Sequence, residues 1–69
     1  MPAMKTKVQK AIKILMVQND MDVKDLAKKM GMATMTIYTR IEGRSKWKVE
    51  EGYRLAEVLG TTFSHIFGS

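Results

Sequence analysis

The segment from Asp22 to Ile41 constrains the fold more than any other part of the chain, because a single glycine separates two short helical patterns. In the first pattern, Leu26, Ala27 and Met30 recur at spacings of one, three and four, which places them on one apolar face of a helix. Gly31 follows where a helix would end on a left-handed residue, a conformation that glycine adopts without a Cβ penalty. We therefore expect a helix from about Val23 that ends at this glycine.

A second helical pattern follows the glycine. Met32 is expected to turn inward, and Ile37 and Ile41, four residues apart, form a buried stripe. Three residues then fall on the far side of this helix: Met35, Thr36 and Thr39. Ala27 is small where two helices joined by a short turn must approach closely. These features predict a helix-turn-helix over residues 22–41, whose second helix can enter the major groove of DNA.

The N-terminal part predicts one further helix. Residues 1–4 are expected to be a loose start, and an amphipathic helix is expected over 5–18. Its apolar face carries Val8, Ala11, Ile12 and Leu15. Asn19 and Asp20 break the pattern, and Asp22 can cap the next helix, with Asp25 in its first turn.

The C-terminal part predicts two helices after a polar loop over 42–46. A helix over 49–59 is expected on the apolar repeat of Val49, Tyr53, Ala56 and Leu59. Gly52 within it suggests close packing, and the acidic residues are interpreted as solvated charges: Glu50, Glu51 and Glu57. Gly60 ends this helix, and Thr62 caps a short last helix that carries Phe63, Ile66 and Phe67. Trp47 is interpreted as a hydrophobic plug.

The composition limits the classes of function. At 69 residues the chain has room for one small domain, expected over residues 1–69. Twelve Lys and Arg against seven acids give a net charge of +5 and favour polyanionic partners such as nucleic acid. The chain has no Cys and one histidine, His65, so we expect no catalytic residue, metal, cofactor or small-molecule ligand. The longest apolar run, residues 14–17, is too short for a membrane span or signal peptide, so we expect a cytoplasmic protein.

Two segments in the right order resemble the Xre/Cro-type, or lambda-repressor-like, helix-turn-helix family. These are DLAKKMGMATMTI, which starts at Asp25, and the closing RLAEVLGTTFSHIF. The resemblance runs from about Ile12 to Phe67 and implies an all-α fold of five helices. It further implies a Cro-sized phage regulator that binds double-stranded operator DNA as a homodimer, on the nucleoid in a bacterial host cytoplasm.

The sequence departs from the family pattern at three positions. Val23 stands where many members carry a Gln that contacts the DNA backbone, so this contact does not carry over. Ala33 replaces the usual Ser or Thr, which leaves the second helix of the motif without a capping side chain unless Thr34 supplies one. Ile41 occupies a position where Glu is common, and Glu42 follows it.

By matched position, the resemblance implies base readout by five residues: Thr34, Met35, Thr36, Tyr38 and Thr39. It implies contacts with the DNA backbone by five cations: Lys24, Arg40, Arg44, Lys46 and Lys48. None of the base-contacting set is Arg, Lys, Asn or Gln, so direct readout should be modest and rest on hydroxyls and on methyl contacts with thymine. The alternatives are a solvated helix face for the threonines, a core-shielding role for Tyr38 and a guanine contact for Arg40.

A second function class fits the same helix. Met32, Met35, Ile37 and Tyr38 concentrate apolar surface around it, which suits a protein interface. The alternative function is therefore an antirepressor or corepressor module that binds a partner repressor protein. Candidate contacts for a homodimer are the tail over 63–67 and the Trp47 region.

Overall fold

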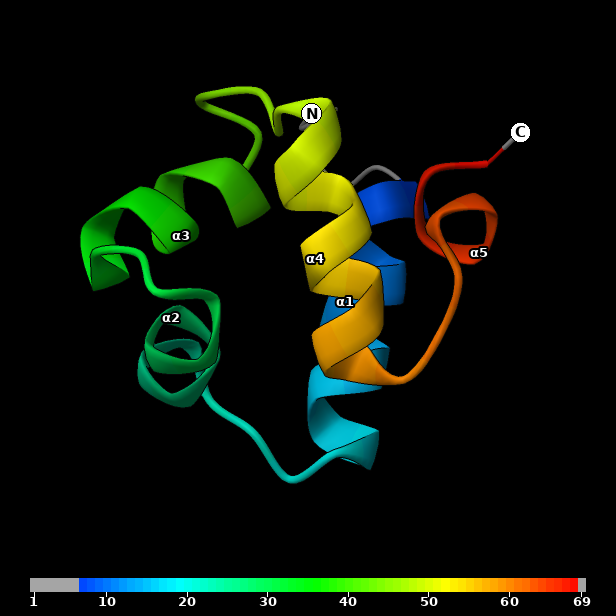
Figure 1. The fold of residues 1–69 in the computed structure, drawn as a ribbon, viewed down its shortest axis with the longest axis horizontal. Helices are drawn as coiled ribbons and strands as arrows, with labels where there is room; N and C mark the ends of the chain where they lie inside the picture. The colour runs from blue at the N-terminus through cyan, green and yellow to red at the C-terminus, as the bar shows by residue number, and fades with distance from the viewer. Residues whose placement is uncertain (1–6, 69) are drawn as a thin grey trace.

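The computed structural model describes residues 7–68, which form five helices and no strand. Their bounds are α1 Lys7–Gln18, α2 Val23–Met30, α3 Thr34–Ile41, α4 Val49–Leu59 and α5 Phe63–Phe67. Figure 1 shows α2 and α3 together on one side of the molecule and α5 on the other, with α1 and α4 between them. The predicted all-α fold is confirmed, while the expected loose start over 1–4 and the first two residues of the helix expected over 5–18 lie outside the described residues.

The predicted start and stop signals of α2 are confirmed. The Asp22 carboxylate accepts a hydrogen bond from the Asp25 amide at 2.8 Å, and the Asp25 carboxylate accepts from the Asp22 amide at 3.3 Å. This reciprocal arrangement is a capping box, which satisfies amides that the helix itself leaves free. Gly31 ends α2 in the left-handed region with φ of 69°, and its amide donates to the Lys28 carbonyl at 3.2 Å. The sharp turn that follows sets the angle between α2 and α3.

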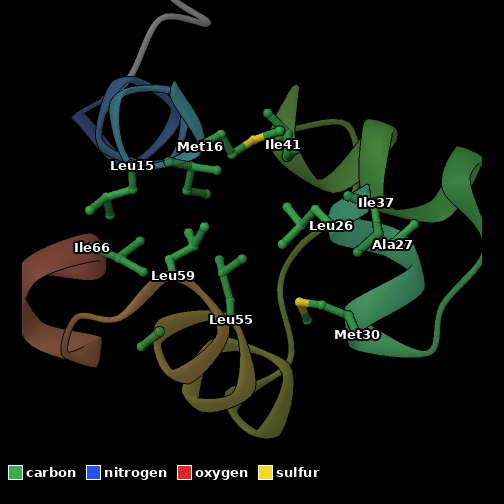
Figure 2. Close-up of a cluster of buried hydrophobic side chains, with 12 residues drawn as sticks. Leu15, Met16, Leu26, Ala27, Met30, Ile37, Ile41, Leu55, Leu59 and Ile66 are labelled. Atoms are coloured by element: carbon green, nitrogen blue, oxygen red, sulfur yellow. The ribbon is translucent and has the colours of Figure 1, made fainter. Parts of the chain in front are cut away.

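The core draws large aliphatic side chains from all five helices (Figure 2). Five of them, one per helix, are at most 2% exposed: Ile12, Leu26, Ile37, Leu55 and Ile66. Ala27 is also buried, at the position where α2 and α3 were predicted to approach closely. Because α3 contributes Ile37 and Ile41 to this core, its opposite face must point to solvent.

The predicted apolar face of α4 is wrong in part. Val49 and Tyr53 are 66% and 60% exposed, whereas Leu55 is buried together with Ala56 and Leu59. The buried stripe instead begins at Gly52, which lies inward because α5 packs directly on it. A Cβ atom at Gly52 would lie 2.6 Å from Phe63 Cε2, so the close packing expected there is confirmed.

The face of α1 also differs from the prediction. Gln9 and Met16 are buried, although neither was placed on the apolar face, and Val8 and Ala11 are only half-buried. The centre of the buried face is therefore rotated toward Met16, which packs against the core beside Ile12.

Polar contacts tie the helix ends to α4. Asn19 Nδ2 donates to the Leu15 carbonyl at 2.8 Å and to the Leu59 carbonyl at 3.1 Å, which joins the end of α1 to the end of α4. Arg54 Nη1 donates to the Met30 carbonyl at 3.2 Å, at the end of α2. These bonds satisfy carbonyls left free at helix ends and hold α2 against α4.

Candidate nucleic-acid interface

The first turns of α3 present an exposed surface. Thr34 and Met35 are exposed, Met35 to 69%, and Tyr38 is 43% exposed, whereas Thr36 is half-buried. These residues lie opposite the buried Ile37, so four of the five predicted base-contacting residues lie at or beside one solvent-facing surface.

Thr39, the fifth predicted base-contacting residue, has a different environment. It is half-buried, and its Oγ1 donates to the Thr36 carbonyl at 3.0 Å and lies 3.2 Å from Ser45 Oγ. The Thr39 carbonyl also accepts from the amides of Arg44 and Ser45, at 2.9 and 3.3 Å. Thr39 therefore anchors the loop after α3, and we no longer place its hydroxyl among the base-contacting groups.

Arg40 is held inside the protein by an ion pair with α4. Its Nε donates to Glu51 Oε1 at 2.7 Å, its Nη2 to Oε2 at 3.2 Å, and its Nη1 to Ser45 Oγ at 3.1 Å. Both side chains of the pair are 15% exposed. The expectation that Arg40 is available to a phosphate or a guanine is therefore revised, because all three guanidinium nitrogens already donate within the protein.

Glu51 is not a solvated charge, contrary to the sequence-based interpretation. Besides accepting from Arg40, its carboxylate accepts from the Lys48 amide at 2.9 Å and so caps the start of α4. Hydrogen bonds from Arg40, more than any other contact, hold the pKa of Glu51 below its usual range. Glu51 thus fixes the last turn of α3 and the end of the loop in one arrangement.

The loop after α3 carries three exposed cations: Arg44, Lys46 and Lys48. Arg44 Nη2 donates to Glu42 Oε1 at 2.8 Å, with the Arg44 side chain 63% exposed. A hydrogen bond to the same carboxylate raises the pKa of the Tyr38 hydroxyl. Exposed ion pairs of this kind add little stability, so Arg44 can exchange Glu42 for a phosphate at small cost.

A hollow on the other flank of α3 lies at its N-terminus. Its lining includes two exposed lysines, Lys24 and Lys28, together with Ala33, Thr34 and Asp25, whose carboxylate already accepts from the Asp22 amide. Ala33 supplies no side-chain cap, Thr34 does not replace it, and no acidic residue occupies the first turn of α3. The positive end of the helix is therefore open toward anions on the side where the two lysines lie.

Val23, which replaces the family's Gln, packs half-buried against the core.

Sequence inspection missed Ser45 and Glu51, which position the loop and α3. A local signal existed for Thr39, because Thr in a helix often bonds to a carbonyl three or four residues earlier. Over residues 7–68, no cluster of three His, Asp or Glu side chains is arranged to hold a metal ion. Within the same residues, no helix has the length and apolar character needed to span a membrane.

A family model described as helix-turn-helix matches residues 12–66 of the chain. No curated protein and no solved structure matches the chain. Because the family match covers most of the chain, the protein belongs to the helix-turn-helix family of Xre and lambda-repressor type, a family of DNA-binding regulators.

Proposed function

We propose that this helix-turn-helix protein is a Cro-like repressor that inserts α3 into the major groove of operator DNA. One observation carries the proposal: the exposed face of α3 lies between two groups of exposed cations. Lys24 and Lys28 flank its N-terminus, and the loop cations follow its C-terminus: Arg44, Lys46 and Lys48. Cations on both flanks suit the two phosphate backbones that border the groove, because phosphate contacts position a protein on the duplex.

Within the groove, α3 offers hydroxyl and methyl groups for base contacts. Thr34 and Thr36 supply hydroxyls that accept or donate to several bases, and Met35 supplies an apolar surface for thymine methyl groups. Tyr38 adds a hydroxyl next to Glu42 at the edge of the face. No side chain of this set makes the two-bonded contact with guanine or adenine that contributes most to discrimination, so specificity is modest for one copy.

A homodimer on a two-fold operator compensates for this modest readout. Two copies double the number of base contacts, and their α3 helices then occupy half-sites roughly 34 Å apart, one helical turn of DNA. The repressor would act on the bacterial nucleoid.

Selection of bound duplexes from a random pool tests this function. We expect recovery of a palindrome, and we expect Thr34→Ala to weaken binding to it by about fivefold, the loss of roughly one hydrogen bond. Ser64→Ala removes an exposed hydroxyl from α5 and serves as the matched control with unchanged affinity. A pool that stays random after repeated rounds would contradict sequence-specific binding.

The antirepressor or corepressor function remains the second proposal, and it rests on the 69% exposure of Met35. A Met35→Asp variant separates the two functions when a repressor encoded beside this protein is present. Partner binding would be favoured if Met35→Asp no longer co-purified with the repressor while Thr34→Ala left DNA occupancy unchanged. Loss of DNA binding with an intact protein complex would favour the operator.

A further inference from the structure

The solvent-facing side of α1 carries two aliphatic side chains that no other described helix covers. Ile14 is 57% exposed and Val17 is 78% exposed. Together with Lys10 they follow the spacing of four and three that places residues on one helix face. The opposite face packs Ile12 and Leu15 into the core. Contiguous exposed apolar side chains, unlike single ones, mark interaction sites on a protein surface.

The surface beside these residues carries opposite charges at its two ends. Ile14 lies in a hollow that is lined also by Lys7, Lys10 and His65, with no carboxylate in the lining. Val17 lines a second hollow whose charged residues are all acidic: Asp20, Asp22 and Asp25. Charge therefore changes sign along α1, with the aliphatic pair at the boundary.

We propose that α1 is a self-association surface on which a second copy of this chain packs with its α1 antiparallel. A two-fold axis that passes between Ile14 and Val17 places Ile14 of each copy against Val17 of the other copy. The same axis brings Lys10 of one copy to the acidic end of the other. A parallel arrangement would instead oppose like charges, which costs rather than contributes binding energy.

Asp20 is the acidic residue most available to such a partner. Asp22 and Asp25 are engaged with each other in the capping box of α2, whereas Asp20 is exposed in the turn after α1, at φ of 55°. Lys10 is exposed as well, which leaves both side chains able to pair across the axis.

The aromatic residues near the C-terminus are a weaker candidate for this contact. Their rings already pack within one copy, with Phe63 and Phe67 centroids 4.6 Å apart and Trp47 edge-on to Phe67 at 6.5 Å.

The α1 surface deepens the proposed function, because it supplies a face for the homodimer on which the two-fold operator rests.

One helix face buries less than the roughly 800 Å² per partner of a standard interface. We therefore expect weak association, with a dissociation constant of about 10 to 100 µM. On DNA, adjacent half-sites would raise the effective concentration of each copy for the other and so favour the pair.

Sedimentation velocity without DNA tests the surface, over about 1 to 500 µM protein. We expect a monomer–dimer equilibrium, which Ile14→Ser and Val17→Ser each weaken by about tenfold or more. Val49→Ser is the matched control, because it removes an exposed aliphatic residue from α4 and should leave the equilibrium unchanged. A chain that stays monomeric throughout, or an equal effect of Val49→Ser, would overturn the proposal and leave the face to a different partner protein.

A charge exchange tests the antiparallel orientation. Lys10→Glu and Asp20→Lys should each weaken self-association, because each places like charges across the axis. An equimolar mixture of the two variants should restore dimers, since both contacts in the mixed dimer then join opposite charges. Failure of the mixture to associate, with both variants folded by circular dichroism, would reject the antiparallel arrangement. Because DNA is absent, these outcomes are independent of whether the protein recognises an operator.

Discussion

Replacement of Glu51 by Gln should release Arg40 toward DNA. In the folded protein, Arg40 makes two hydrogen bonds to the Glu51 carboxylate and one to Ser45. Gln has nearly the same shape but no charge and only one acceptor oxygen, so the guanidinium loses its ion partner and one of the two acceptor oxygens that residue 51 supplies. Arg40 lies in the last turn of α3, beside the loop that we propose to follow the DNA backbone.

The size of the effect follows from the count of phosphate contacts. Each added contact steepens the dependence of log affinity on log salt by about 0.9. If Glu51→Gln and the wild type bind random duplex equally at about 1 M salt, one released arginine makes the variant's binding about eightfold tighter than the wild type's at about 0.1 M salt. Fluorescence anisotropy with a labelled random duplex, at several salt concentrations, measures both the slope and the affinity.

Two controls assign the effect to Arg40. Glu50→Gln makes the same change of net charge at the neighbouring exposed position and should give a smaller change of slope. The double variant Arg40→Gln with Glu51→Gln should return the slope to the wild-type value. A slope unchanged in Glu51→Gln would refute the argument. Weaker binding at low salt would also refute it, and would show that Glu51 serves DNA binding only by holding α3 in place.

Three further predictions concern stability. Leu55→Ala should lower the free energy of unfolding by about 2 to 5 kcal/mol in urea denaturation, because Leu55 is fully buried between the helices; a loss below about 1 kcal/mol would contradict the described core. Thr62→Ala removes the hydroxyl that accepts from the His65 amide at 3.1 Å and should cost about 1 kcal/mol, measured as a lower midpoint of thermal unfolding. Since Arg40 lowers the pKa of Glu51 from its usual 4.5, the ion pair's contribution to stability should be complete above pH 4.5 and lost as the pH falls through the lower, folded-state pKa. The stability difference between wild type and Glu51→Gln should therefore shrink on acidification, and a difference independent of pH would contradict the pair's role.

The sequence predicts those parts of the fold that are determined within one helical turn. Asp22 caps α2, Gly31 ends it, and Thr62 caps α5, because each signal acts on amides or carbonyls a few residues away. The exposed surface of α3 was predictable for a similar reason, since the burial of Ile37 fixes which residues face outward.

Contacts between distant segments were not predictable from the same patterns. Val49 and Tyr53 match an apolar helix repeat, yet α5 packs on Gly52 and turns both toward solvent. Glu51 pairs with Arg40 across a loop whose path depends on the Thr39 hydrogen bonds, so no local spacing indicates the pair.

Amide chemical-shift mapping, during titration with a selected duplex, tests most directly the claim that α3 and its flanking cations form the DNA interface. We predict the largest shifts over residues 33–39 and 44–48, smaller ones at Lys24 and Lys28, and, at the centre of α1, only the shifts that pairing of two copies on the duplex causes. Shifts concentrated on α1 or α5, with residues 33–39 unaffected, would contradict the proposed interface.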